Sequence, residues 1–392
     1  MLIDVSAVQE ALREEGIDGW LLYDFHGSNP IARTVAGLDD RGGLTTRRWY
    51  YLIPAAGEPQ ALVHRIERNV LDHLPGRRRV YAGREQLEAG LAGMIGGGRL
   101  AMEYSPGGAI PYVSRVDAGT VDAVRRLGAT VVSSGDLVQR FEAVWDEQAL
   151  ALHREASAAL YRIKDRAFAL IAARMKADAP VGEFEVQQAM CAWFEEEGLV
   201  SDSAPVVAAQ ENSGNPHYLP TAASSRAIGR DEVVLLDLWG KRNAAAAVFA
   251  DITWVGYTGA SVPERYVSVF GVARDARDTA VSLVSDAASN GRELRGWEVD
   301  RAARTVIEAA GFGLQFVHRT GHSLGEEVHG NGVHMDDYET HDERRLLPGT
   351  GFTIEPGIYF DEFGVRTEIN MHVGRRAAEV TGPLQQEVVA LG

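Results

Sequence analysis

Residues 351–370 read GFTIEPGIYFDEFGVRTEIN, and this stretch does most to predict the fold. It sets Glu355 and Glu368 into apolar, strand-like sequence, and the midpoint between them falls between Asp361 and Glu362. Each glutamate is therefore expected on one strand of a hairpin, at the same distance from the turn. Residues in such positions can face each other across paired strands, with Cβ atoms about 5 Å apart, a separation that one cation can bridge.

A second acidic pair lies upstream, in residues 234–254, VLLDLWGKRNAAAAVFADITW. Asp237 and Asp251 flank a polar and small stretch, so we expect them to face each other across a hairpin as well. Between the two pairs, HRTGHSLGEEVHG at 318–330 supplies His322. An unpaired buried charge has to shift its pKa and neutralise, so several converging carboxylates need a cation.

The sequence therefore predicts a metal site. Its expected ligands are Asp237, Asp251, His322, Glu355 and Glu368. Side chains alternate along a strand, which places Arg366 and Asn370 on the face of Glu368, and Thr253 on the face of Asp251. We expect these three side chains to support the ligands.

The carboxy-terminal part repeats the order of its elements. Residues 148–198 predict two helices, followed by a strand, His217 and the hairpin with two aspartates. Residues 263–311 predict two more helices, followed by His318, His322 and the hairpin with two glutamates. The two halves share almost no sequence identity, so the order of elements alone predicts a pseudo-twofold repeat whose hairpins line one pocket.

The first part of the chain predicts a separate layer of short strands and helices. At 392 residues the chain exceeds the usual size of one core, so two domains are expected. The composition changes to a long Ala-rich helix after about Trp145, which places domains at 1–145 and 146–392. We read Gly96 to Gly98 as a plain turn, because a strand follows and no Lys-Ser or Lys-Thr completes a phosphate loop.

Composition excludes several partners. The net charge of −16 argues against binding to nucleic acid or to an anionic membrane surface. No stretch is apolar enough to span a membrane, and Cys191 has no second cysteine to pair with. The first residues are too charged for a signal peptide, so we expect a cytoplasmic protein.

Several segments resemble the signature segments of one family. GHSLGEEVHG, TIEPGIYF, GVRTEI and DITW look like those of the pita-bread metallopeptidases, a fold shared by methionine aminopeptidase, aminopeptidase P, prolidase and creatinase. The resemblance covers roughly residues 150–392, and the part before it is similar to the creatinase-like domain of prolidase and aminopeptidase P. It implies an α/β N-terminal creatinase-like domain plus an α+β pita-bread catalytic domain.

The resemblance also implies a two-metal site. Asp237 would bind one metal ion, Asp251 and Glu368 would bridge both, and His322 and Glu355 would bind the second. Such a set of four carboxylates and one imidazole suits Mn²⁺ best, with Co²⁺ or Zn²⁺ as alternatives. Two adjacent cations can turn a shared water into a hydroxide that attacks a peptide carbonyl.

Further residues receive roles by the same resemblance. Glu355 would shuttle a proton as well as bind metal. His217 and His329 would lie near the substrate, and His318 would precede the ligand His322 by about one turn. Arg366, which strand alternation places on the ligand face, would lie either against a substrate or against Asp237. The residues expected to take part in catalysis are Glu355, His217, His318, His329 and Arg366.

The expected substrate is a small peptide with proline at the second position. The chain is short for aminopeptidase P, which favours an Xaa-Pro dipeptidase acting as a homodimer. Aminopeptidase P, which accepts longer peptides, is the alternative. A catalytically silent binding homologue, or a metal-free hydrolase of the creatinase type, is the alternative from another class, and the presence of all five ligands argues against it.

A dipeptidase needs a cation to bind the free carboxylate of its substrate, and arginine suits that task. Besides Arg366, the candidates are Arg344 and Arg345 before LLPGTGF, and three arginines of LDDRGGLTTRRW, namely Arg41, Arg47 and Arg48.

Three features depart from the family pattern. Asp237 and Asp251 are 14 residues apart, which predicts a longer hairpin tip at 241–246. Gly330 follows His329, where an acidic residue is common, and Trp239 stands where a small residue is usual.

Overall fold

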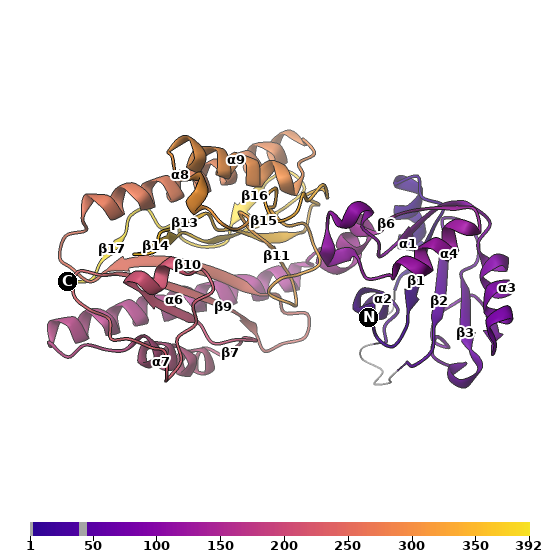
Figure 1. The fold of residues 1–392 in the computed structure, drawn as a ribbon, viewed down its shortest axis with the longest axis horizontal. Helices are drawn as coiled ribbons and strands as arrows, with labels where there is room; N and C mark the ends of the chain where they lie inside the picture. The colour runs from indigo at the N-terminus through magenta and orange to yellow at the C-terminus, as the bar shows by residue number, and fades with distance from the viewer. Residues whose placement is uncertain (1–2, 39–44) are drawn as a thin grey trace. The chain divides into compact units, whose positions relative to one another are not determined.

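The computed structural model describes residues 3–38 and 45–392, which form two compact units, Met1–Glu142 and Ala143–Gly392 (Figure 1). The predicted boundary after residue 145 lies three residues beyond this division. Trp145 belongs to the second unit because its backbone N–H donates to the Gly349 carbonyl (2.7 Å) and its indole N–H donates to the Leu324 carbonyl (3.2 Å).

The first unit is built on a mixed sheet with strand order β4-β3-β2-β1-β5-β6. Its strands are β1 (Gly19–Asp24), β2 (Trp49–Pro54), β3 (Gln60–His64), β4 (Arg77–Tyr81), β5 (Gly98–Met102) and β6 (Ala129–Ser133). Its helices include α1 (Val5–Glu14), α2 (Pro30–Val35), α3 (Arg84–Met94), α4 (Ala118–Arg126) and α5 (Gly135–Val138). The α/β layer expected from the sequence is thus confirmed.

The central strand β1 is buried along its whole length, as expected for a strand covered on both faces. Two hydrophobic clusters pack on the two sides of this sheet. Strand β4 was not predicted, because Arg77, Arg78 and Arg79 give it no apolar pattern. The predicted turn at Gly96 to Gly98 is confirmed: Gly98 has φ +77°, and a Cβ there would lie 2.5 Å from Asp18 Oδ2.

The second unit carries the predicted pairs of helices. They are α6 (Glu147–Lys176) with α7 (Glu183–Glu196), and α8 (Glu264–Asn290) with α9 (Gly296–Ala309). One sheet has the order β17-β10-β9-β7, with β8 also pairing β9, and a second has the order β11-β12-β15-β16, while β13 and β14 form a separate two-stranded sheet. The strands are β7 (Leu199–Val200), β8 (Val206–Ala209), β9 (Val233–Arg242), β10 (Ala250–Tyr257), β11 (Ser323–Leu324), β12 (Gly351–Ile354), β13 (Gly357–Tyr359), β14 (Gly364–Arg366), β15 (Ile369–Val373), β16 (Ala378–Val380) and β17 (Val389–Ala390).

The pseudo-twofold repeat is confirmed by this arrangement. Helices α6 and α7 cover one side of the strands and α8 and α9 cover the other (Figure 1). The second helix of each pair has 14 residues, and a glutamate in its first turn, Glu185 or Glu298, accepts from the backbone N–H of the residue before the helix. The repeat therefore includes the hydrogen bond that caps the N-terminus of the second helix in each pair.

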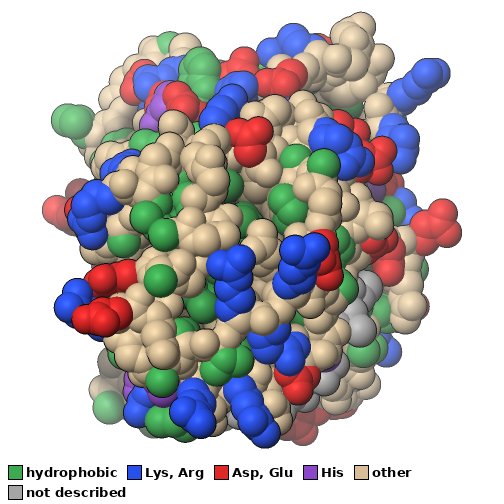
Figure 2. All heavy atoms as spheres, turned by 90° about the vertical axis from the view of Figure 1, so that its right-hand side faces the viewer, with side chains coloured by type: hydrophobic (Ala, Val, Ile, Leu, Met, Phe, Trp, Pro, Cys, Tyr) green, Lys and Arg blue, Asp and Glu red, His purple; other side chains and the backbone are tan. Residues whose placement is uncertain are grey.

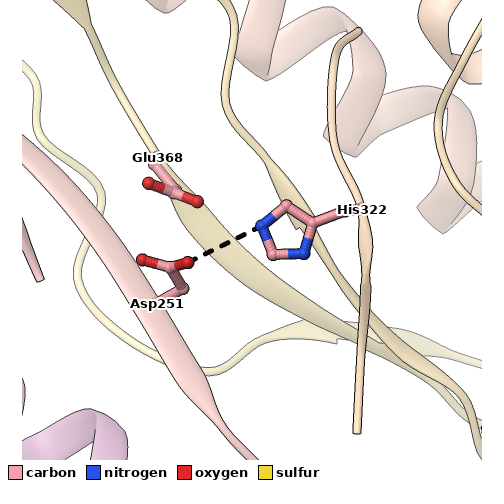
Figure 3. Close-up of side chains that lie close together, drawn as sticks. All are labelled: Asp251, His322 and Glu368. Carbon is pink, nitrogen blue, oxygen red and sulfur yellow. Dashed lines mark ion pairs between the residues drawn. The ribbon is translucent and has the colours of Figure 1, made fainter. Parts of the chain in front are cut away.

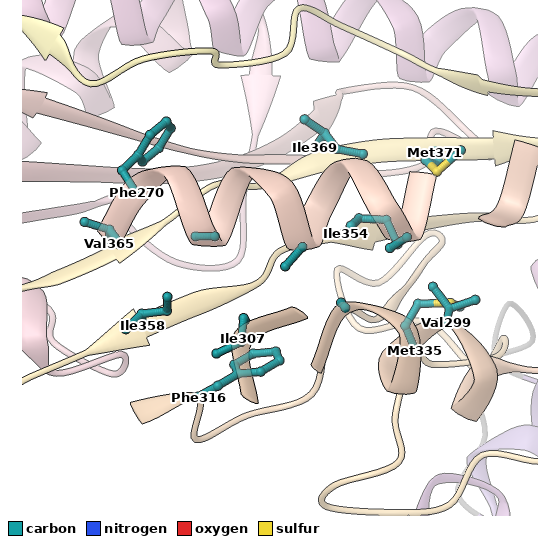
Figure 4. Packing of buried hydrophobic residues seen from close by; sticks show 14 of the residues in the cluster. Phe270, Val299, Ile307, Phe316, Met335, Ile354, Ile358, Val365, Ile369 and Met371 are labelled. Atoms are coloured by element: carbon teal, nitrogen blue, oxygen red, sulfur yellow. The ribbon is translucent and has the colours of Figure 1, made fainter. Parts of the chain in front are cut away.

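The core of the second half fixes the strands that carry the glutamates. Phe270 of α8 and Val299 of α9 belong to one cluster with Ile354, Ile369 and Met371 of the sheet (Figure 4). Ile354 and Ile369 are each next to one of the expected glutamate ligands and are at most 1% exposed. Burial of such side chains contributes about 1.5–3 kcal/mol each, which holds the adjacent carboxylates in place.

On the face drawn in Figure 2, several Lys and Arg side chains gather across the lower centre, and most Asp and Glu side chains lie nearer the top and the edges. Within the described residues, no helix has both the length and the apolar composition needed to cross a membrane.

A buried histidine of α6 is expected to make the stability of the second unit depend on pH. His153 is fully buried, with Nδ1 2.8 Å from the Phe249 carbonyl and Nε2 2.7 Å from Thr381 Oγ1. Burial lowers the pKa of His153 to about 4, and the nearby His372 and Arg154 act in the same direction.

We expect His153→Gln to remove part of this pH dependence. The folded pKa lies below the unfolded value of about 6.5, so the contribution to stability is complete above pH 6.5 and is lost as the pH falls toward 4. Between pH 7 and pH 4.5, the free energy of unfolding of the wild type should fall by about 2–3 kcal/mol relative to the variant. Urea unfolding at both pH values measures this difference, and equal falls in both proteins would contradict it.

Candidate active site

The second hairpin has the register that the sequence predicted. Gly357 pairs with Arg366 and Ile354 pairs with Ile369, so the pairing stays centred between residues 361 and 362. Glu355 and Glu368 occupy equivalent positions in the gap between these two ladders. Their backbone N–H groups donate elsewhere, to the carbonyls of Thr320 (2.7 Å) and Thr253 (3.2 Å).

The register of the first hairpin corrects a prediction. Asp251 pairs with Trp239, and Asp237 pairs with Thr253, so the two aspartates are diagonal neighbours and do not lie directly opposite. They still share one face of the sheet. Asp251 lies opposite Trp239, Asp237 is two residues before Trp239 on the same strand, and alternate residues of a strand point to the same face. The strand also runs on to Arg242, since β7 pairs with Lys241 and Arg242, so the tip begins later than the predicted 241.

Three of the predicted ligands converge. Asp251, His322 and Glu368 are buried, and each offers one ligand atom within 4.8 Å of those of the other two (Figure 3). His322 Nε2 lies 3.6 Å from Asp251 Oδ2 and 3.6 Å from Glu355 Oε1. An isolated bridge between Thr253 and Glu368 joins the two sheets at this point. Tertiary structure thus brings together residues that are up to 117 positions apart.

Threonine hydroxyls hold the ligands in place. Thr253 donates to Glu368 Oε2 (2.7 Å), and Thr353 donates to Glu355 Oε1 (3.1 Å). The Thr353 hydroxyl also accepts the backbone N–H of His322 (2.9 Å). The backbone N–H of Asp251 donates to Asn370 Oδ1 (2.8 Å). Thr253 and Asn370 were predicted to lie on the ligand face, whereas Thr353 was not.

Arg366 lies behind the acids. It forms an ion pair with Asp237, donates from Nε to Thr253 Oγ1 (2.9 Å) and from Nη1 to Tyr359 Oη (3.1 Å). Its Nε is also 4.0 Å from a carboxylate oxygen of both Glu355 and Glu368. Of the two roles considered for Arg366, this geometry favours support of Asp237.

The donor set fits a divalent cation. Burial raises the pKa of Asp251 and of Glu368 well above the usual range, and the like charges of neighbouring carboxylates raise both further. Asp251 Oδ1 is buried without a hydrogen-bond partner among the described residues. Carboxylates packed this closely stay ionised only beside a cation, and an unpaired buried oxygen is a ready ligand. Oxygen and imidazole donors suit Mn²⁺, Co²⁺ or Zn²⁺.

The three further histidines differ in their surroundings. His329 is solvent-accessible, and its ring centroid lies 4.3 Å from that of His322 in an edge-on arrangement. His217 is exposed and lies close enough for its charge to lower the pKa of His329, although burial and Arg319 have larger effects. His329 therefore lies against a predicted ligand of the cluster, and His217 acts on His329 through its charge.

His318 is held from both ring nitrogens. Nδ1 lies 2.7 Å from the Arg319 carbonyl, and Nε2 lies 2.8 Å from Tyr359 Oη. Burial, together with the charge of Arg366, lowers its pKa to about 3. His318 is thus a neutral imidazole in the Tyr359–Arg366 network. Tyr359 was not predicted to belong to the site. The one sequence feature that could have indicated this role is its position on a short strand, two residues after Gly357.

Most of the arginines considered as carboxylate clamps are engaged elsewhere. Arg344 is buried and bidentate with Asp342 (2.9 and 2.6 Å), so it cannot also bind a substrate carboxylate, and that candidate was wrong. Arg48 lies over the ring of Phe25, and Arg47 donates to Thr46. The backbone of Arg345 forms an isolated antiparallel β-bridge with the backbone of Arg295. Arg41 lies outside the described residues.

Two departures from the family pattern have structural causes. A Cβ at Gly330 would lie 3.2 Å from Ser323 Oγ and 3.3 Å from the Gly325 nitrogen, so a larger residue would crowd the strand beside His322. The indole N–H of Trp239 donates to Asp202 Oδ1 (2.7 Å). Asp202 in turn raises the pKa of His329, which places this carboxylate at the same end of the site.

Two facing half-domains with a buried Asp, His and Glu cluster between their sheets define a pita-bread metallopeptidase. Residues 151–375 match the model described as metallopeptidase family M24. The chain belongs to this family, and the family and fold predicted from the sequence are confirmed.

Similar proteins include peptidases that act on short peptides. An Xaa-Pro dipeptidase of Lactobacillus helveticus is 34% identical over 175 residues, which cover 44% of this chain and 43% of that relative. The chain therefore matches less than half the length of this curated relative. A dipeptidase of Pyrococcus horikoshii OT3 has a TM-score of 0.62 at 25% identity and covers 98% of this chain and 99% of its own. Dipeptidase PepE from Mycobacterium ulcerans, at 21% identity, shows the same fold with a TM-score of 0.70, over 99% of this chain and 96% of its own.

Proposed function

We propose that this metallopeptidase is an Xaa-Pro dipeptidase that binds two divalent metal ions, with Mn²⁺ as the expected metal. The observation that carries the proposal is the buried convergence of Asp251, His322 and Glu368, with Glu355 at its edge. The Lactobacillus helveticus relative is an Xaa-Pro dipeptidase, which supports the choice of Xaa-Pro dipeptides.

The five ligands keep their predicted assignments in this proposal. Asp251 and Glu368 would bridge the two ions, and His322 and Glu355 would bind one of them. Asp237 would bind the other ion through the carboxylate that Arg366 orients. When bound, two such ions acidify a shared water and polarise the scissile carbonyl.

The remaining chemistry falls to side chains of the chain itself. Glu355 would take up a proton at a carboxylate oxygen and deliver it to the leaving proline nitrogen. The backbone N–H of Glu355 donates to the Thr320 carbonyl, and Glu355 Oε1 accepts from the Thr353 hydroxyl, so that the carboxylate keeps one orientation. His217 and His329, which are both accessible, would bind and orient the substrate. His318 would act through Tyr359 and Arg366, not directly on the peptide.

Activity on three substrates tests this function. With Mn²⁺-loaded protein, kcat/KM for Ala-Pro should exceed that for Ala-Pro-Ala at least about 10-fold, and creatine should not react. Comparable rates on dipeptide and tripeptide would support aminopeptidase P. Creatine hydrolysis without added metal, or no hydrolysis of any peptide, would overturn the two-metal dipeptidase.

The expected homodimer and the expected cytoplasmic location stay predictions. Light scattering on the purified protein measures the first, because a dimer of this 42.6 kDa chain has twice its mass.

A further inference from the structure

We propose that Glu183, the first residue of α7, is a positioning residue that holds the segment 209–226 and thereby sets the position of His217. The proposal rests on the proposed function, because it assigns His217 to the substrate. Glu183 lies outside the five predicted ligands and outside every predicted catalytic residue.

The carboxylate of Glu183 is completely buried and is the central acceptor for this segment. Oε1 accepts the backbone N–H of Ala209 (2.7 Å) and the amide of Asn212 (2.9 Å). Oε2 accepts the hydroxyl of Tyr218 (2.6 Å) and the backbone N–H of Arg226 (3.0 Å). Donors from the start, middle and end of one segment therefore meet on one side chain, and buried acceptors of this kind are costly to leave unpaired.

A second anchor fixes the same segment on its other side. The backbone N–H of Gly364 donates to Ser213 Oγ (2.9 Å), and the amide of Gln210 donates to the Glu362 carbonyl (2.9 Å). A Cβ at Gly214 would lie 2.1 Å from the Phe360 carbonyl oxygen, so the chain passes closely over the turn between β13 and β14. That turn precedes Arg366 and Glu368, which ties the position of the segment to the ligands.

His217 itself has few contacts of its own. Its backbone N–H donates to Asn215 Oδ1 (3.0 Å), and its side chain is exposed. The next residue is Tyr218, whose hydroxyl is bound by Glu183. The place of the imidazole is thus set mainly by the segment, and a shift of the segment by about 1 Å is enough to cost on the order of 100-fold in rate when a group orients the substrate.

The other half of the repeat uses a similar device. Asp300 of α9 is fully buried and accepts from the backbone N–H (2.8 Å) and the hydroxyl (2.7 Å) of Thr320, two residues after His318. The Thr320 carbonyl accepts the backbone N–H of Glu355. In both halves, a buried acid of the second helix therefore holds the segment that carries a histidine of the site.

A double-mutant cycle tests the assignment to Glu183. On Ala-Pro, Glu183→Gln should lower kcat/KM about 10- to 100-fold. The amide N–H₂ of glutamine would replace one carboxylate oxygen and would face hydrogen-bond donors that it cannot accept from. In a His217→Ala background the same substitution should cost less than about 2-fold, since the two residues act on one interaction. Equal losses of kcat/KM in both backgrounds would overturn the proposal, because a general structural defect would lower activity whether or not His217 is present.

Glu185→Gln is the matched control. Glu185 lies in the same turn of the same helix, undergoes the same chemical change and, within the described part of the chain, pairs with Arg174 and with the backbone of Gly182. It should retain full kcat/KM, and a loss equal to that of Glu183→Gln would overturn the proposal. If Glu183→Gln does not fold, Tyr218→Phe removes one of the hydrogen bonds, and we expect a smaller loss that also disappears in His217→Ala.

Hydrogen exchange separates this inference from the proposed function. In Glu183→Gln, backbone amides of 209–226 should exchange at least about 10-fold faster than in the wild type, with β12 and β15 unchanged. If the wild type cleaves no Xaa-Pro dipeptide, the function fails while this measurement still tests the anchor. Unchanged exchange in 209–226 would overturn the positioning role even in an active enzyme.

Discussion

Asp251→Asn is expected to abolish peptide hydrolysis and to make the metal-free protein more stable. Asp251 is 5% exposed, has one oxygen without a hydrogen-bond partner in the part of the chain that the structure describes, and lies among carboxylates that raise its pKa. A neutral amide removes this like charge, so the free energy of unfolding without metal should rise by about 1–2 kcal/mol. The same change removes a bridging ligand, so kcat/KM on Ala-Pro should fall more than about 100-fold.

Two measurements check this pair of effects. Urea unfolding with a chelator reports the stability of the metal-free protein, and unfolding with Mn²⁺ reports how much the ion stabilises each form. The wild type should gain stability from Mn²⁺, and Asp251→Asn should gain little. Asp361→Asn, at an exposed position in the turn between β13 and β14, is the control and should behave as the wild type. A variant that is less stable without metal and still active would contradict the metal site.

Arg366→Met is expected to give the largest loss of stability at the site. The guanidinium is buried, pairs with Asp237 and lies 4.0 Å from oxygens of Glu355 and Glu368. Its removal leaves a buried carboxylate without its cation, which typically costs about 3–5 kcal/mol. Bound metal should restore part of this loss, because its charge can compensate the same acids.

The control for this prediction is Arg292→Met. Arg292 forms a partly exposed ion pair with Glu298 (3.2 Å), and such pairs contribute about 0–1 kcal/mol. Urea unfolding with and without Mn²⁺ compares the two variants. If Arg366→Met costs no more than Arg292→Met, Arg366 does not hold the acids in place.

Much of the fold could be predicted because it depends on local patterns. The Ala-rich composition of α6 and the continuous apolar run of β1 mark them in the sequence, and the structure has both. Strand β4 was missed because it is polar and forms only by pairing with β3 in the sheet. The register of the second hairpin was correct, but that of the first was not, because β7 and β8 both pair with β9 and fix its register from outside the hairpin.

For the site, the sequence identified the candidate residues, and the tertiary structure decided which of them contact one another. Buried acids in apolar strands need a partner of opposite charge, so the sequence alone predicted that Asp251, Glu355 and Glu368 belong to a cation site. It could not decide between a substrate clamp and a support for Arg366, nor exclude Arg344, since both depend on contacts made in the folded chain. It also gave no signal for Glu183, which differs from an exposed helix glutamate only through the segment that covers it. Local patterns fix which residues are buried, whereas the partner of a buried charge is set by segments distant in sequence.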